Sequence, residues 1–222
     1  MRKLLFLVLT LAITLVFPYD VKGQVGNIAP GLKATDRYTL VGEKNLLTGY
    51  QPKSPDGNLI VVVEIPTGTV AKWEVTKPEG SLKWEFKNGK PRIVKYLGYP
   101  GNYGMVPRTL LPKELGGDGD PLDVIVLGPA VPRGSVVEAK LIGVLKLLDG
   151  GEQDDKLIAV LANTALYEAG NLKELKEKFS GVTTIVETWF TNYKGPGKLV
   201  SQGYGDVEEA RKILEAAIKA FK

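Results

Sequence analysis

The sequence contains no cysteine and no histidine. These two absences exclude Ser-His-Asp and Cys-His catalysis, histidine general bases, zinc fingers, iron–sulfur clusters and disulfides. Any catalysis must therefore use carboxylates, Lys, Arg, Tyr or Ser/Thr. Any bound metal must be a hard ion held by oxygen atoms, such as Mg²⁺, Mn²⁺ or Ca²⁺.

A large excess of charge of one sign is also missing. The 222 residues include 29 Lys and Arg against 25 Asp and Glu, a net charge of +4, which is too small to indicate nucleic-acid binding by itself. The composition is 44% hydrophobic, 24% charged and 8% aromatic, which is typical of a folded globular protein and excludes extensive disorder. The length favours one domain, and the sequence shows no internal repeat.

One long apolar run is present, at the N-terminus. The basic triplet Met1-Arg2-Lys3 precedes uncharged residues 4–17, and Pro18 ends the run. This order is typical of a secretory signal peptide, here residues 1–23, with cleavage before Gln24. An uncleaved anchor is the alternative, but the run is short for a membrane span. We therefore expect export to the periplasm or the exterior, no stable membrane anchor after cleavage, and a mature charge of +2; the protein is cytoplasmic if this interpretation is wrong.

Residues 24–58 contain scattered Gly, Pro, Asn and Lys without a sustained hydrophobic period, which predicts an irregular N-terminal extension. A single domain over residues 59–222 follows. Apolar runs bounded by turn residues predict strands in this domain, and Asn88-Gly89 predicts a hairpin turn. The predicted strands cover residues 59–65, 70–75, 82–86, 92–97, 124–127, 136–147 (bent at Gly143) and 157–162.

Helices are expected at the C-terminal end of the chain. Asn171 can cap a helix that continues to Phe179, and Asp206 with Glu209 resembles a capping box at the start of a last helix ending near Phe221. Between them, residues 182–193 place Ile185, Trp189 and Tyr193 on one helical face. Many short strands followed by helices predict a mainly β protein with α-helices, a small barrel or curled sheet on which the helices pack.

Two acidic loops border apolar strands. In the first, Asp118, Asp120 and Asp123 lie within six residues among glycines, and such close carboxylates repel one another unless a cation lies between them. A solvated turn is the alternative, because Asp, Gly and Pro all favour turns. An EF-hand loop is disfavoured, since Pro129 occupies the position that requires a bidentate Glu.

The second loop carries Asp149, Glu152, Asp154 and Asp155, followed by Lys156. Alone, it would be interpreted as a charged hairpin tip. If neighbouring strands bring the two loops together, five or more carboxylates converge, which is more than one ion needs. The pair of loops therefore favours a site for several divalent ions.

Six segments of the sequence, which follow one another along the chain in the order typical of the family, resemble the soluble, magnesium-dependent (family I) inorganic pyrophosphatases. The similarity extends from about Leu59 to the C-terminus and implies a five-stranded OB-type closed barrel with helices packed against it at the C-terminal end. The matching segments are Asp118-Gly-Asp-Pro-Leu-Asp123; Glu64-Ile-Pro with Lys72-Trp-Glu74; Arg92; Tyr99-Pro-Gly-Asn-Tyr103-Gly104; Gly143 to Asp149 with Asp154 and Lys156; and Trp189-Phe190 with Tyr193-Lys194.

The resemblance implies hydrolysis of pyrophosphate to two orthophosphates by metal-activated water, with Asp120 as the general base. It also implies several Mg²⁺ ions per site, with Mn²⁺ as an alternative. Separately, we expect a homo-oligomer, and the small net charge and acidic cluster lead us to expect no nucleic-acid partner. By the same resemblance Asp118, Asp120, Asp123, Asp149 and Asp154 bind metal; Lys72, Arg92, Lys156, Tyr193 and Lys194 bind phosphate; and Glu64, Glu74, Tyr99 and Tyr103 line the site.

These residue types suit the chemistry. Divalent ions lower the pKa of water, a nearby carboxylate can accept its proton, and Arg and Lys bind phosphate oxygens. The main alternative is an OB-type module that binds an oligonucleotide or oligosaccharide without catalysis, although such a module needs a basic, aromatic face and the densest cluster here is acidic. A metal-binding protein without activity and a different metal phosphohydrolase are two further alternatives.

Overall fold

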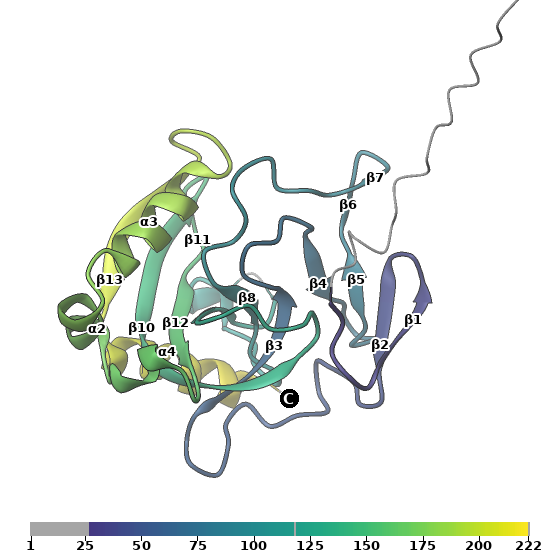
Figure 1. The fold of residues 1–222 in the computed structure, drawn as a ribbon, viewed down its shortest axis with the longest axis horizontal. Helices are drawn as coiled ribbons and strands as arrows, with labels where there is room; N and C mark the ends of the chain where they lie inside the picture. Colours follow the sequence, from purple (N-terminus) through teal and green to yellow (C-terminus); the bar gives the residue numbers. More distant parts are fainter. Residues whose placement is uncertain (1–26, 118, 222) are drawn as a thin grey trace, which may run out of the picture.

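The structure is a computed structural model that describes residues 27–117 and 119–221. The predicted signal peptide and Asp118 lie outside the described residues. Five strands form a closed ring at the centre of the molecule (Figure 1). In the order of their pairing they are β3 (Leu59–Ile65), β8 (Asn102–Met105), β9 (Asp123–Leu127), β12 (Lys156–Leu161) and β10 (Val136–Asp149).

Strand β10 closes the barrel because it is long enough to pair with four other strands. One edge pairs with β12; the other pairs first with β3 and then with β13 (Leu199–Gly205). The register against β12 shifts between Leu141 and Gly143, so the predicted bend at Gly143 is confirmed as a bulge. Beyond this bend, Asp149 pairs with Glu152 in the short strand β11 (Glu152–Gln153), which gives a tight hairpin.

Strands β9 and β12 run parallel, and both of their faces are covered. Successive residues of β9 alternate between two hydrophobic clusters: Val124 and Val126 join one, Ile125 and Leu127 the other. A strand buried on both faces needs apolar residues at every position, which explains the unbroken apolar runs in the sequence. Asp123 and Lys156, immediately before these runs, therefore emerge together at one edge of the barrel.

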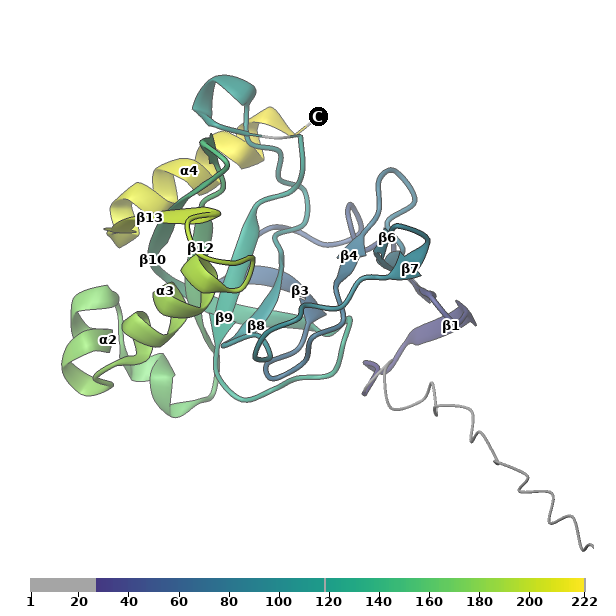
Figure 2. The same cartoon turned by 90° about the horizontal axis from the view of Figure 1, so that it is seen from above.

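Within the described residues, three α-helices pack on the barrel (Figure 2). They are α2 (Leu172–Lys178), α3 (Val182–Asn192) and α4 (Val207–Ala220). The caps predicted at Asn171 and Asp206 are both present, each side chain accepting a hydrogen bond from the backbone N–H three residues later. Within residues 27–117 and 119–221, no helix is long and apolar enough to cross a membrane.

A second sheet packs beside the barrel and corrects one prediction. Residues 24–58 were expected to be irregular, but β1 (Leu32–Asp36) and β2 (Thr39–Gly42) form a hairpin that pairs with β5 (Leu82–Trp84) and, through it, with β4 (Trp73–Val75). Local periodicity is weak in such short strands, and their pairing partner lies about forty residues further along the chain. The remaining elements are the hairpin strands β6 (Phe86–Lys87) and β7 (Lys90–Pro91) and the 3₁₀ turns η1 (Lys113–Leu115) and η2 (Ala165–Glu168).

Three further expectations differ from the structure. Residues 92–97 are not a strand; Ile93 forms only an isolated bridge to Ala71. Strands β8 and β13 were not predicted, because their glycines and polar residues lack a clear alternation. Ile185 does not share the buried face of Trp189, and its side chain is 63% exposed, because the helix packs through Val186 and Phe190 instead.

Candidate active site

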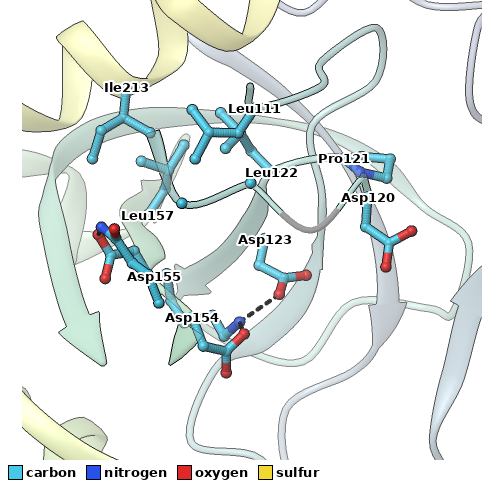
Figure 3. A pocket seen from close by; sticks show the side chains of 13 residues that line it. Leu111, Asp120, Pro121, Leu122, Asp123, Asp154, Asp155, Leu157 and Ile213 are labelled. Atoms are coloured by element: carbon cyan, nitrogen blue, oxygen red, sulfur yellow. Dashed lines mark hydrogen bonds and ion pairs between the residues drawn. The ribbon is translucent and has the colours of Figure 1, made fainter. Parts of the chain in front are cut away.

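The two acidic loops meet at the edge of the barrel where β9 and β12 begin. The Lys156 amine lies between them and donates to an Asp123 oxygen at 2.5 Å and an Asp154 oxygen at 2.6 Å. Figure 3 shows both carboxylates directed toward this amine, with Asp120 on the far side of Asp123. The parallel pairing of β9 with β12 sets this geometry, since Val124 stands beside Leu157 in the register.

Basic and tyrosine side chains lie opposite these carboxylates on the same concave surface. We call Lys72, Arg92, Tyr193 and Lys194 the cationic wall of the site. Cavities that share Asp123 are continuous here, and together they are lined by all thirteen predicted site residues that the structure describes. Lys72 and Glu74 come from β4 and its entry, Arg92 from the end of β7, and Tyr193 and Lys194 from the end of α3. Asp118 lies outside the described residues, so its predicted place in the site stays a prediction.

The tyrosines are positioned by an aromatic cluster. The rings of Trp189 and Tyr193 stack with centroids 4.5 Å apart, and Tyr99 lies 4.4 Å from Trp189. Tyr103 packs 5.3 Å from Tyr99, and the Lys72 amine lies 5.2 Å from the centre of the Tyr103 ring. Burial raises the pKa of Tyr99 and of Tyr103 well above that of a free phenol, so both stay protonated and can donate hydrogen bonds.

The carboxyl groups differ in their pKa because their surroundings differ. Burial alone would raise the pKa of Asp123, but Lys156, Lys72 and hydrogen bonds from Lys156 and Tyr103 outweigh it and lower the pKa. For Asp154, burial prevails over Lys156 and raises the pKa. For Lys156 the two carboxylates outweigh the effect of burial, so its pKa is raised and the amine stays charged.

Glu64 has a strongly raised pKa. Its side chain is buried on β3 and accepts a hydrogen bond from the Val75 N–H at 2.6 Å. Burial raises its pKa to about 8, with Lys72 opposing the shift. Burial likewise raises the pKa of Glu74, again opposed by Lys72.

Two contact residues were missed in the sequence. Glu85 accepts two hydrogen bonds from Arg92, at 2.7 and 2.8 Å, and holds the guanidinium at the cavity wall. The Asn88-Gly89 turn could have revealed it: Lys87 pairs with Lys90 and Phe86 with Pro91, so Glu85 stands opposite Arg92. Lys77, which contacts Asp120, had no local signal because the two come together only in the folded chain.

The donor set suits a hard divalent ion. Four carboxylates, of Asp120, Asp123, Asp149 and Asp154, border one cavity system. In the part of the chain that the structure describes, no three acidic side chains converge closely enough to hold an ion as they stand. Lysines contact them instead: Lys77 reaches Asp120, Lys156 reaches Asp123 and Asp154, and Lys194 reaches Asp149.

Carboxylates that border Lys, Arg and Tyr side chains at the edge of a closed five-stranded barrel define a protein with a site for a small phosphate polyanion. Comparisons with known proteins agree with this class. The sequence model of the family described as inorganic pyrophosphatase matches residues 61–222. The chain belongs to the inorganic pyrophosphatase family.

Individual relatives cover most of the chain. The chain is 36% identical to the inorganic pyrophosphatase of Helicobacter pylori over 170 residues, 74% of this chain and 92% of the relative. It is 35% identical to that of Saccharolobus solfataricus over 179 residues, with 78% and 97% covered. The solved structure of the Helicobacter pylori protein superposes with a TM-score of 0.63 at 33% identity and covers 74% of this chain and 93% of that one. The expected OB-type barrel is thereby confirmed.

Proposed function

We propose that this protein hydrolyses inorganic pyrophosphate to two orthophosphates. The observation that supports the proposal best is the pair of adjoining cavities whose walls combine four carboxylates with Lys72, Arg92, Tyr193 and Lys194. A small, highly charged phosphate anhydride needs both halves: cations and phenols for its oxygens, and carboxylates for divalent ions. The alternative hypothesis, a module that binds an oligonucleotide on a basic, aromatic face, is not favoured, because acidic side chains line the cavities.

Each residue has a task in this proposal. Asp118, Asp120, Asp123, Asp149 and Asp154 would hold Mg²⁺, or Mn²⁺ in its place, which lowers the pKa of water and offsets phosphate charge. Arg92, held in place by Glu85, presents its remaining N–H groups to phosphate oxygens, and Lys72 and Lys194 add point charges. Lys156 keeps Asp123 and Asp154 in position and stands at the same cavity wall. Asp120 accepts a proton from the attacking water.

A phosphate-release assay tests the proposal. Purified residues 24–222 should release orthophosphate from pyrophosphate in Mg²⁺, release little from ATP or a phosphomonoester, and lose activity in excess EDTA. A binding titration with a single-stranded oligonucleotide serves as the comparison for the binding-module alternative. Oligonucleotide affinity without phosphate release from pyrophosphate would contradict the proposal, and full activity in EDTA would exclude the metal-dependent mechanism.

We propose, in addition, that residues 1–23 direct export and are removed before Gln24. The order of basic residues, apolar run and small residues supports this. An intact-mass measurement on protein recovered from the native host should give the mass of residues 24–222. A mass that includes residues 1–23 would instead indicate an anchor or a cytoplasmic protein.

We also infer that the protein forms a homo-oligomer without a nucleic-acid partner. Apolar exposure on one side of the molecule supports this: Leu97 and Ile185 are among the most exposed large apolar residues, and Trp189, one turn after Ile185, donates a hydrogen bond to the Leu97 carbonyl. Light scattering coupled to size-exclusion chromatography should give a mass that is a multiple of the single chain. A monomer at micromolar concentration would contradict it.

A further inference from the structure

A second concave surface continues outward from the active-site cavity. It lies between the β6–β7 hairpin with the segment after it and the chain that follows α3. The two cavities share four lining residues, Arg92, Asp149, Tyr193 and Lys194, so they lie next to each other. We name this surface the lysine groove after four additional residues that line it: Lys87, Lys90, Lys95 and Lys198.

The groove has an excess of positive charge that the active-site chemistry does not use. All four lysines are exposed, and none forms an ion pair with an acidic side chain in residues 27–117 and 119–221. Of the described residues that line the groove, Asp149 is the one acid, and Lys194 already contacts it. For a chain whose net charge is only +4, this is a strong local concentration. Clefts lined by charge of one sign attract and hold ions of the other.

Two of the lysines stand directly opposite each other. Lys87 and Lys90 form a cross-strand pair in the β6–β7 hairpin, on either side of the Asn88-Gly89 turn. Both turn residues have positive φ, 54° and 71°, so the hairpin is tight and the two side chains leave it close together. Like charges directly opposite each other destabilise a strand pair. An anion bound between the two amines removes that repulsion.

The contents of the groove favour a phosphate chain over a nucleic acid. Single-stranded nucleic acids need aromatic faces on which bases stack. Tyr193 is the one aromatic ring among the described groove residues, and one of its faces is already stacked on Trp189. Lysines without stacking partners are suited to a flexible polyanion that has only phosphate oxygens to offer.

We propose that the lysine groove binds the internal phosphoryl groups of a linear inorganic polyphosphate whose terminal phosphoryl groups occupy the active-site cavity. The inference rests on the proposed function, because the bond broken is of the same kind. The oxygen of a water molecule forms a bond to the terminal phosphorus, and the terminal P–O–P bond breaks. The products are one orthophosphate and a chain shorter by one phosphoryl group, and the proton of the water passes to Asp120 and then to solvent.

Binding and hydrolysis are measured separately. The first measurement is calorimetric titration of the mature chain with tetrapolyphosphate and with pyrophosphate, in EDTA and at low ionic strength, where neither ligand is hydrolysed. The test variant carries Lys87→Gln, Lys90→Gln, Lys95→Gln and Lys198→Gln. The matched control carries Lys212→Gln and Lys219→Gln, two exposed lysines on α4 outside the groove. The second measurement is phosphate release from both ligands in Mg²⁺.

We expect the groove variant to bind tetrapolyphosphate at least about tenfold more weakly, the combined effect of four exposed charges. The affinity for pyrophosphate, which is short enough to lie inside the active-site cavity, should change by less than about twofold. The control variant should bind both ligands as the wild type does. In Mg²⁺ the groove variant should lose kcat/KM for tetrapolyphosphate and keep it for pyrophosphate.

Three results overturn the inference: unchanged tetrapolyphosphate binding in the groove variant, an equal loss for both ligands, or equally strong competition by a single-stranded oligonucleotide. If the wild-type protein hydrolyses pyrophosphate but any of these three results is obtained, the proposed function stands and the polyphosphate-binding role of the groove is rejected. If the wild-type protein does not hydrolyse pyrophosphate, the proposed function is rejected. The groove still stands as a polyphosphate-binding site if only the groove variant loses tetrapolyphosphate binding.

Discussion

At the scale of single residues, Lys156 organises the acidic edge. Its side chain is only 5% exposed, and it donates to both Asp123 and Asp154. A buried amine is costly to desolvate unless carboxylates accept its hydrogen bonds, and here two do. The amine in turn keeps Asp123 ionised, which a ligand for a divalent ion must be. Asp120 differs because its side chain is 60% exposed and reaches the solvent-facing part of the cavity.

The exposed position of Asp120 suits proton transfer and leads to the first prediction. Asp120→Asn preserves size but removes the proton-accepting charge, so kcat for pyrophosphate should fall by about 10²- to 10⁴-fold. Activity should recover in part at high pH, where hydroxide forms without a base. Steady-state kinetics across pH measures both effects.

Asp155→Asn is the matched control. Asp155 belongs to the second acidic loop, but its carboxylate accepts hydrogen bonds from the Leu147 N–H and the Gln153 amide. In Figure 3 it points away from Asp123. The kcat of the Asp155→Asn variant should stay within about threefold of wild type, since no general-base contribution is lost. A folded Asp120→Asn protein with near-wild-type kcat at neutral pH would place the base elsewhere.

Glu64 supports a prediction about stability and pH. Its pKa in the folded protein is raised from 4.5 to about 8, so between these values the folded state holds a proton that the unfolded chain has released. The contribution of Glu64 to stability is therefore present below pH 4.5 and is lost as pH rises toward 8. Glu64→Gln cannot ionise and can still accept from the Val75 N–H.

In EDTA, the free energy of unfolding of Glu64→Gln should match that of wild type near pH 4.5 and exceed it by up to about 5 kcal/mol well above pH 8. Urea denaturation at the two pH values measures the difference. An identical difference at both pH values would show that Glu64 does not titrate in this range.

At the scale of elements, the β1–β2 hairpin is part of the folded core. Leu40 on β2 joins a hydrophobic cluster with Trp73 and Leu82 of the sheet that carries Lys72 and Glu74. Tyr38 in the hairpin turn packs edge-on against Phe86, with ring centroids 4.9 Å apart. The hairpin thus supports the cationic wall of the site from behind without entering the cavity.

Two neighbouring residues of β2 test this role. Leu40 is 1% exposed and Val41 is 41% exposed. Leu40→Ala should lower the free energy of unfolding by about 2–4 kcal/mol, because it leaves a cavity in a packed cluster. Val41→Ala should change it by less than about 1 kcal/mol. Urea denaturation measures the free energy of unfolding of both variants. We expect both variants to have a KM for pyrophosphate near that of the wild type. Equal effects of the two substitutions would mean that the hairpin is only loosely attached.

At the scale of the whole molecule, ring closure gathers the site. Glu64, Tyr103, Asp123, Asp149 and Lys156 come from five different strands, and each strand pairs with two neighbours in the barrel. Because the ring is closed, no strand can slide without breaking two ladders. The backbone that carries the acidic edge is consequently held in place before any cation binds.

Carboxylates that the folded barrel gathers and the unfolded chain does not predict that divalent ions stabilise the folded state by mass action. Mg²⁺ at one hundred times its dissociation constant should add about 2.7 kcal/mol and raise Tm by a few degrees. Differential scanning calorimetry measures this, with NaCl at matched ionic strength as the control. Asp123→Asn should reduce the gain. An equal rise in NaCl would show that the effect is general screening and not binding.

The sequence alone determined the elements whose signals are local. Four of the five barrel strands, β3, β9, β10 and β12, contain a run of apolar residues; β8, with the sequence Asn-Tyr-Gly-Met, does not and was not predicted. Asn171 and Asp206 cap helices through neighbouring N–H groups, and Asn88-Gly89 forms its hairpin turn. The acidic loops were recognisable because carboxylates and glycines gather within a few residues. The family resemblance then identified thirteen described residues that do line one cavity system.

Only the tertiary structure decided the features that join distant parts of the chain. The pairing of β2 with β5, the contact between Lys77 and Asp120, and the addition of β13 to β10 depend on segments that are far apart in the sequence. The same holds for the lysine groove, whose members lie on both sides of a gap of more than one hundred residues between Lys95 and Lys198. Local periodicity cannot encode such contacts, because they form only when the barrel closes and brings its edges and loops together.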